Sequence, residues 1–358
     1  MDLVNATPLP AKLMTSEIAG VPGRIGVIAA KATFQFDTRG HVTLDTQNPI
    51  GIFLKEENTE LGMLPSDNVP RMDPAFEVIV LGAAYAPGGY AITHRRVSLA
   101  VGHVRRDLAV FGDRAWLVAA GARQITRPLP FVRMPLGPDR AFGGRCQVLI
   151  DHDTPIEVAD PTNPYGRGFD PGPLARGLCS TLKAPAGFPQ YDPMRALPNV
   201  ENPAALISRW DDTPAPVFWA TVPPTSGLHA RRCLEVDESH NPPFGLLDTA
   251  HHRAHPDWVI PVPPEHSIVR LEGLTPEETV AFWLPALRVG VDYVVGARTG
   301  YRELAPQTMV LLPDQKRFYI VYRHRFTYGF GSGDERSMRL RLDHGWFQPP
   351  AHSTQETE

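Results

Sequence analysis

Three histidines in one short segment are the residues of this chain that are best suited to bind a metal ion or to take part in catalysis. His251, His252 and His255 lie in the sequence AHHRAHPDW, and a helix would place His251 and His255 four residues apart on one face. Two imidazoles at that spacing can hold a zinc ion, with a carboxylate such as Asp257 as a third group. The zinc-protease pattern requires a glutamate where this chain has His252, and Pro256 limits a helix. A metal-dependent hydrolase or modifying enzyme is therefore the alternative hypothesis, and a contact surface or solvated loop without a bound metal is preferred.

The other patterns that resemble catalytic motifs are better explained as structure. The run GFGSG at 329–333 resembles a phosphate-binding loop, but the following DERSMRLRL alternates as a strand, which predicts a tight hairpin. Neither GxxxxGK[ST] nor GxSxG occurs in the sequence. Acidic pairs such as Asp211 and Asp212 are usually solvated when they lie on polar loops. We therefore predict a protein that is not an enzyme, with no catalytic residue and no cofactor.

Four segments combine arginine or asparagine with aromatic residues, glycine and proline: GDRAW, PFVRMPLGPDRAFGG, NPYGRGF and LPNVENP. Arginine donates forked hydrogen bonds to carbonyls and carboxylates, so such segments can pin loops onto a β scaffold. Arginine and aromatic residues are also the types that dominate protein interfaces. Both interpretations stay open for the candidate loop-anchoring or partner-binding residues, which are Arg114, Trp116, Arg140, Phe142, Asn163, Phe169 and Glu201.

The elements that must position these residues are predicted to be strands. Proline accounts for 38 of the 358 residues and glycine for 30, and prolines spread along the chain disfavour long helices. The sequence GVIAAKATFQFD at 26–37 alternates, with apolar side chains on one face and Lys31, Thr33 and Gln35 on the other. The apolar run at 76–85 predicts a strand covered on both faces. We expect a mainly β fold of antiparallel, sandwich-like sheets with long Pro/Gly-rich ordered loops and little helix.

Composition divides the chain into three regions and a tail. Residues 1–127 and 226–348 carry alternating runs and are predicted to form an N-terminal and a C-terminal β region. Residues 128–225 are rich in proline and glycine but keep scattered aromatic residues, which predicts an ordered loop region packed on the N-terminal one. Within the C-terminal region, the sequence TPEE at 275–278 predicts the capped start of a short helix. Residues 349–358 are small and polar, which predicts a flexible tail.

Charge and cysteine content bear on the kind of partner. Lys and Arg number 35 against 39 Asp and Glu, with no long run of one sign, so we predict no binding to nucleic acid or to a membrane surface. Three irregularly spaced cysteines do not make a disulfide framework, which favours a reducing compartment. The N-terminal residues lack the pattern of an export signal, and no apolar run approaches the ~18 residues of a membrane span. We expect a soluble, cytoplasmic protein.

Several of these segments, in one order along the chain, resemble a known family. They are KATF (31–34), SDNVP (66–70), VLGAAYAPGG (80–89), GDRAW (112–116), MPLGPDRAFGG (134–144), NPYGRGF (163–169) and LPNVENP (197–203). A closing pattern, LLPDQKRFYIVYRH, ends in a strand that carries Tyr322 and Arg323. Together they resemble a bacterial domain-of-unknown-function family associated with type VI secretion.

The resemblance implies an effector chaperone or adaptor, a protein that binds a cognate toxin effector and helps to load it onto the secretion spike. The spike or its PAAR-tip protein would be a further partner, and a structural component of the spike assembly is a further alternative. The chain departs from the family pattern at 246–258, where LLDTAHHRAHPDW replaces a proline-rich acidic segment. This departure marks the candidate residues for cargo specificity, which are His251, His252, His255 and Trp258.

Overall fold

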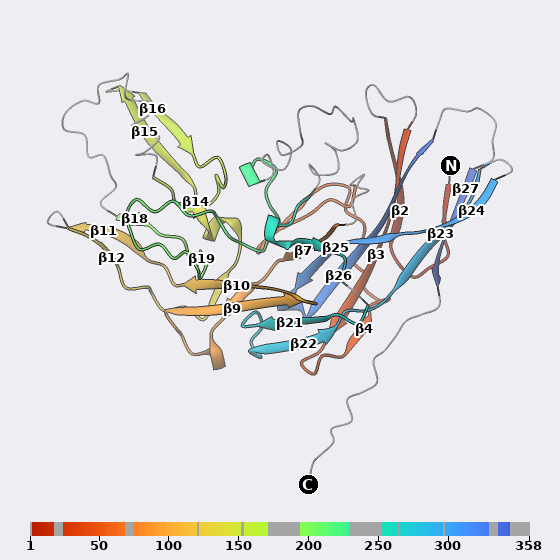
Figure 1. Ribbon diagram of the computed structural model, residues 1–358, viewed down its shortest axis with the longest axis horizontal. Helices are drawn as coiled ribbons and strands as arrows, with labels where there is room; N and C mark the ends of the chain where they lie inside the picture. Colours follow the sequence, from red (N-terminus) through yellow and green to blue (C-terminus); the bar gives the residue numbers. More distant parts are fainter. Residues whose placement is uncertain are drawn as a thin grey trace, which may run out of the picture.

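A computed structural model describes residues 2–17, 24–68, 75–119, 122–151, 154–170, 194–228, 252–263, 265–295, 298–328 and 336–343. The fold is mainly β, with 52% strand and 6% helical residues and several antiparallel sheets (Figure 1). The predicted fold class is therefore confirmed. No described helix is long and apolar enough to span a membrane. The predicted tail at 349–358 lies outside the described residues.

The largest sheet has seven strands, which come from both ends of the chain. Its strand order is β2 (Ala11–Glu17), β3 (Arg24–Phe36), β26 (Arg317–Tyr328), β25 (Ala305–Leu312), β7 (Ala75–Val80) and β20 (Val259–Pro261), with β4 (Val42–Leu44) paired to β3. All of these pairs are antiparallel except β25 and β7, which run parallel. The N-terminal and C-terminal β regions therefore share one sheet.

A five-stranded sheet packs against the apolar face of the seven-stranded sheet. Its strands are β19 (Val200–Glu201), β10 (Val104–Phe111), β9 (His94–Val101), β21 (Ile268–Glu272) and β22 (Thr279–Trp283). Phe282 of β22 stacks on Phe36 of β3 and on Phe318 of β26, with ring centroids 4.8 and 5.0 Å apart. This face-to-face contact of two sheets is the sandwich-like arrangement expected from the alternating sequence.

The remaining strands form smaller sheets. One has the order β1 (Asp2–Asn5), β27 (Arg336–Asp343), β23 (Arg288–Val295) and β24 (Arg298–Glu303), and another β12 (Ala122–Ile125), β11 (Ala115–Ala119) and β18 (Met194–Ala196). Pairs are formed by β13 (Arg133–Pro135) with β8 (Ala83–Tyr85), β14 (Phe142–Gly143) with β17 (Arg167–Gly168), β15 (Arg145–Asp151) with β16 (Thr154–Ala159), and β5 (Glu57–Thr59) with β6 (Gly62–Leu64). Single 3-10 turns are η1 (Pro87–Gly89), η2 (Pro138–Arg140), η3 (Pro256–Trp258) and η4 (Pro313–Gln315).

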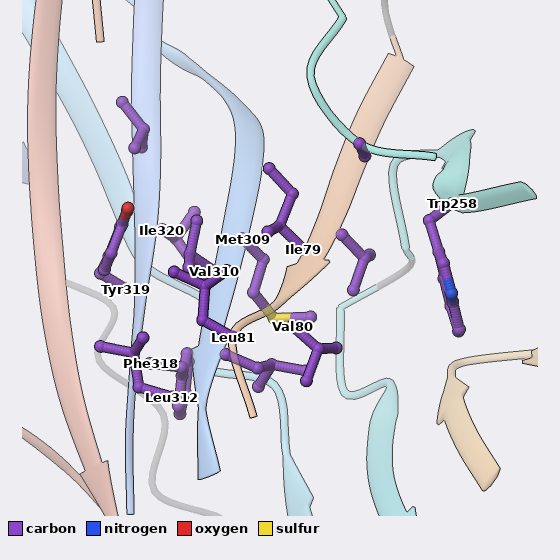
Figure 2. Close-up of a cluster of buried hydrophobic side chains, with 14 of the residues drawn as sticks. Ile79, Val80, Leu81, Trp258, Met309, Val310, Leu312, Phe318, Tyr319 and Ile320 are labelled. Atoms are coloured by element: carbon purple, nitrogen blue, oxygen red, sulfur yellow. The ribbon is translucent and has the colours of Figure 1, made fainter. Parts of the chain in front are cut away.

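Strands β7, β25 and β26 supply the centre of the core. Val78, Ile79 and Val80 of β7 are fully buried, as predicted for a strand covered on both faces, but the predicted strand at 76–85 is divided, since residues 83–85 form β8 in another sheet. Figure 2 shows the side chains of the three strands packed together, with Trp258 on the far side of β7. Close packing of this kind makes the sheet a rigid base for the polar groups that it carries.

Strand β3 is buried on both faces at Lys31 and Thr33, although its sequence alternates and Gln35 is exposed. The apolar face, including Phe34, is part of the core, and Lys31 and Thr33 on the opposite face are also at most 1% exposed. A loop covers this second face, since the N–H of Ile50 donates to the hydroxyl of Thr33 at 2.8 Å. Alternation shows which side chains share a face, and here the covering loop makes the polar face an interior one.

Two local predictions are wrong. The TPEE sequence forms a turn between β21 and β22, in which Gly273 donates its N–H to the carbonyl of Glu278 at 2.6 Å and Glu278 has φ 69°. Pairing of the two flanking strands imposes this turn. The glycine run at 329–333 lies outside the described residues, but the described strands on either side of it do not pair as a hairpin, because β26 pairs with β3 and β25 while β27 pairs with β1 and β23.

Candidate functional site

A buried series of charged and polar side chains begins at Lys31 on β3. Its ammonium lies 2.6 Å from a carboxylate oxygen of Asp67, and both side chains are at most 1% exposed. The ammonium also donates to the carbonyl of Gly51 at 2.8 Å and lies 3.9 and 4.4 Å from the ring centroids of Phe53 and Tyr319. A charge taken out of water is costly unless it is paired and hydrogen-bonded. Lys31 has a counter-ion, a hydrogen bond and two aromatic faces.

Arg323 on β26 extends the series toward the middle of the sheet. Its Nε donates to the backbone carbonyl of Asp67 at 3.1 Å, and another guanidinium nitrogen lies 3.6 Å from the carboxylate of Asp67. Arg323 also donates to the hydroxyl of Thr308 at 2.9 Å, and that hydroxyl donates to Glu77 at 3.1 Å. The buried polar network, as we call Lys31, Asp67, Arg323, Thr308 and Glu77, is therefore continuous across the sheet.

Strand register explains why residues so distant in sequence meet. Lys31 and Thr308 both pair with Val321, and Thr308 pairs with Glu77. Paired residues on neighbouring strands project from the same face of a sheet. One row of the seven-stranded sheet therefore carries a cation, a hydroxyl and a carboxylate on the face that the loops cover.

Glu77 anchors the histidine segment to this face. Its carboxylate accepts hydrogen bonds from the backbone N–H groups of Arg253 and Ala254, the latter at 3.1 Å. Nδ1 of His252 lies 3.5 Å from the same carboxylate. Residues 252–258 are thus held against the sheet by a buried acceptor that satisfies two backbone donors.

His255 uses both ring nitrogens inside the protein. Nε2 lies 3.1 Å from the carbonyl oxygen of Pro216, and Nδ1 accepts the N–H of Asp257 at 3.3 Å. Since a carbonyl cannot donate, the proton belongs on Nε2. His251 lies outside the described residues, and within the described ones no group of three or more His, Cys, Asp or Glu is placed to hold a metal ion. The proposed His251 and His255 pair is therefore not seen together.

The other candidates for cargo specificity lie inside the protein. Trp258 is fully buried with its ring 5.9 Å from that of Trp219, and His252 and His255 are 5% and 6% exposed. In these positions the three side chains shape the packing of residues 252–258 and present almost no surface to a partner.

No member of the buried polar network was among the site residues predicted from the sequence. Lys31 stood on the polar side of a strand, where it resembles an ordinary solvated lysine. The sequence signal that could have pointed to these residues lies in the family segments, because KATF contains Lys31, SDNVP contains Asp67 and the closing pattern contains Arg323. The structure brings these three segments together in one set of contacts.

Burial makes the charge of Lys31 sensitive to pH. Burial lowers the pKa of its ammonium from 10.5 to about 8, although Asp67 acts in the opposite direction. Between about pH 8 and 10.5 Lys31 holds a proton in the unfolded chain that it has released in the folded chain. The contribution of Lys31 to the free energy of unfolding therefore increases with pH over this range, and it is lost as the pH falls through 8. Over that window we expect the unfolding free energy to gain up to about 3 kcal/mol relative to the Lys31→Met variant. Urea unfolding of both proteins at several pH values measures the difference, and parallel pH profiles would contradict it.

The predicted loop-anchoring residues gather around the three-stranded sheet. Arg114 forms an ion pair with Glu201, whose side chains are 8% and 2% exposed. Glu201 also accepts the N–H of Ile207 at 2.8 Å, and the guanidinium of Arg114 lies 3.7 Å from the ring centroid of Phe111. Burial raises the pKa of Glu201, which Arg114 opposes. This pair joins the GDRAW segment to the LPNVENP segment.

A second, more exposed group surrounds Asp113. Arg140 lies 3.5 Å and Arg167 3.4 Å from its carboxylate, and Asn199 donates to it at 3.0 Å. Arg140 also donates to the side-chain oxygen of Asn199 at 3.3 Å. Four family segments therefore meet at one carboxylate.

Asn163 joins two loops through its buried amide. The amide nitrogen donates to the carbonyls of Pro138 and Phe142 at 2.7 and 2.9 Å. Gly143 beside it has φ 132°, and a Cβ there would lie 2.2 Å from the carbonyl oxygen of Asn163, so glycine is required. Phe169 is half-buried and donates its N–H to Gly143 at 2.9 Å. Asn163, Phe142 and Phe169 thus act together in the loops.

Replacing Asn163 with alanine is expected to lower the free energy of unfolding by about 1–3 kcal/mol, because two buried carbonyls lose their donor. Asn202→Ala is a matched control, since Asn202 is exposed and its side-chain oxygen accepts the N–H of Ala204, an exposed hydrogen bond. That control should change stability by less than about 1 kcal/mol. Equal midpoints for the two variants in chemical unfolding would contradict the anchoring role of Asn163.

An open pocket of about 530 Å³ lies beside these anchors. The rings of Trp116 and Trp210 meet edge to face with centroids 5.7 Å apart, and the guanidinium groups of Arg123 and Arg195 lie 4.6 and 3.9 Å from the Trp210 centroid. The lining residues are Trp116, Arg123, Gln124, Ile125, Ser208, Arg209, Trp210 and Asp211. Of the predicted partner-binding residues, Trp116 alone lines this pocket.

Comparison with known protein families identifies the family of this chain. The model of a family described as "Uncharacterized protein conserved in bacteria (DUF2169)" matches residues 23–323. Neither the curated proteins nor the solved structures contain a match. The matched range contains the whole buried polar network, from Lys31 to Arg323, and every residue that lines the pocket.

Proposed function

The chain belongs to the DUF2169 family of proteins conserved in bacteria, and we propose that it is an adaptor that binds without catalytic turnover. Its cargo is a cognate toxin effector of a type VI secretion system, which it helps to load onto the spike. The adaptor acts in the cytoplasm, before export. The spike or its PAAR-tip protein is the second partner in this proposal.

The observation that carries the proposal is the pocket at Trp116 and Trp210. It is open, it is lined by two tryptophans and two arginines, and it borders a strand at the end of a sheet. Tryptophan and arginine are the side chains that contribute most often to binding energy at protein interfaces. The ionisable groups of the buried polar network, in contrast, are committed to internal contacts, which favours a structural role for them.

Co-expression of the full-length protein with the product of the neighbouring toxin gene tests the proposal. We expect the two proteins to co-purify, and deletion of the adaptor gene to abolish secretion of that toxin but not of others. Failure of the two to associate, with unchanged toxin secretion in the deletion strain, would refute the proposal. Co-purification with the spike in the absence of toxin would favour a structural component of the spike instead.

A further inference from the structure

Strand β12 forms an end of its sheet and lies beside the pocket. Among the described strands its neighbour is β11, and Figure 1 places this pair at one extreme of the molecule, far from β27. Just past β12, the N–H of Thr126 donates to the carbonyl of Ala115 at 2.9 Å. Inward and outward backbone groups alternate along an antiparallel strand, so the N–H and C=O of Ile125 point away from β11. This edge can pair with a further strand.

The pocket lies on one face of this edge. Trp116 pairs with Ile125 and with Arg195, and Val118 pairs with Arg123, so these side chains share a face. Trp210 covers that face between the two arginines. A strand added beside β12 would therefore project every second side chain toward tryptophan and arginine.

Charge indicates the chemistry of the added strand. The pocket lining contains two arginines, Arg123 and Arg209, and one carboxylate, Asp211, which lies 3.2 Å from the guanidinium of Arg209, so the lining as a whole carries a positive charge. An acidic side chain is favoured opposite Arg123, and an apolar one, two positions along, opposite Ile125.

We propose that β12 binds an extended segment of the cargo as an added strand, and that this segment carries an acidic residue two positions from an apolar one. The inference rests on the proposed function only for the identity of the partner. Main-chain hydrogen bonds along the edge supply affinity, and the pocket selects the two side chains.

A second copy of this chain is a poorer occupant. Pairing β12 with its own copy would bring two ARQI strands together, with Arg123 on each strand and Arg127 just beyond its end. Like charges across paired strands are destabilising. An acidic segment meets no such repulsion.

Selection of random dodecapeptides displayed on phage against the immobilised full-length protein tests the inference. We expect enriched peptides to carry an acidic residue two positions from an apolar one. Binding of these peptides should fall at least about tenfold in Arg123→Glu, which reverses the selecting charge. It should fall similarly in Ile125→Pro, which removes the outward N–H while sparing the pairing with β11.

Arg298→Glu is the matched control, because Arg298 is exposed and lies on β24, the end strand of a different sheet. Its peptide binding should equal that of the wild type. Thermal unfolding checks that each variant is folded. If Ile125→Pro does not fold, the inference is tested with Arg123→Glu alone.

Three results would overturn the inference. The first is that enriched peptides bind both β12 variants with the same affinity as the wild type. The second is that selection on the wild type enriches no peptides beyond those enriched on Arg123→Glu. The third is that the wild type sediments as a dimer and that Arg123→Glu sediments as a monomer. Toxin that co-purifies while peptide selection fails would refute the strand site and leave the adaptor role standing. Peptide binding without toxin association would refute the adaptor role and leave the strand site standing.

Discussion

Replacement of Asp67 with asparagine is expected to lower the free energy of unfolding by about 3–5 kcal/mol, the range for breaking a buried ion pair from one side. The amide keeps the shape of the carboxyl group but not its charge, so the buried cations Lys31 and Arg323 lose the carboxylate that they share. Urea unfolding at pH 7 measures the loss as a lower midpoint with an unchanged slope.

An exposed ion pair provides the control for Asp67. Asp292 lies 3.5 Å from Arg341, and both side chains are more than 40% exposed, at 44% and 47%. Asp292→Asn is therefore expected to cost less than about 1 kcal/mol. The double variant Lys31→Met, Asp67→Asn should recover part of the loss, since it removes one of the unpaired charges. Equal costs for Asp67→Asn and Asp292→Asn would show that the network contributes no more than a surface pair.

Replacement of Glu77 with alanine has the second large expected effect. It removes the acceptor for the backbone N–H groups of Arg253 and Ala254 and for the hydroxyl of Thr308. Each of these three buried donors left unsatisfied costs about 1–3 kcal/mol, so we expect a total loss of at least about 3 kcal/mol. The loss should also be local, with residues 252–258 detaching from the sheet before it unfolds.

Hydrogen exchange separates the local effect from the global one. In Glu77→Ala the amides of Arg253 and Ala254 should exchange much faster than in the wild type. The exchange rate of the Met309 amide in β25 should increase only as much as the loss of global stability requires. Glu272→Ala is the matched control, because Glu272 is half-exposed on β21 and pairs with Arg105. Uniform acceleration of all amides would argue against a dedicated anchor at Glu77.

The loop-anchoring hypothesis illustrates how far residue types alone can lead. Arg114, Arg140 and Asn163 were predicted as anchors because their donors suit carbonyls and carboxylates, and the structure gives each of them such acceptors. Glu201, the partner of Arg114, was among the predicted residues, but the partners of Arg140 and Asn163 were not, since Asp113, Asn199 and Pro138 look no different from other loop residues. Which carbonyl or carboxylate lies within reach depends on how the loops are folded.

The histidine segment was misjudged for a related reason. Three histidines, a proline and a tryptophan on a loop suggest an exposed contact surface, but His252, His255 and Trp258 are buried beside Glu77. The carboxylate that holds them is about 175 residues away in the sequence, beyond the range of any local pattern.

The sequence by itself determined the mainly β character, the faces of β3 and β7 and the membership of a bacterial family, because proline content, alternation and ordered motifs are properties of the chain. Only the tertiary structure decided which faces meet solvent. A loop covers the polar side of β3, so Lys31 joins Asp67 and Arg323 in the interior, while β12 remains at the end of its sheet beside two tryptophans. Burial and pairing depend on segments distant in the sequence, and that is the physical reason why the pattern of β3 alone cannot report them.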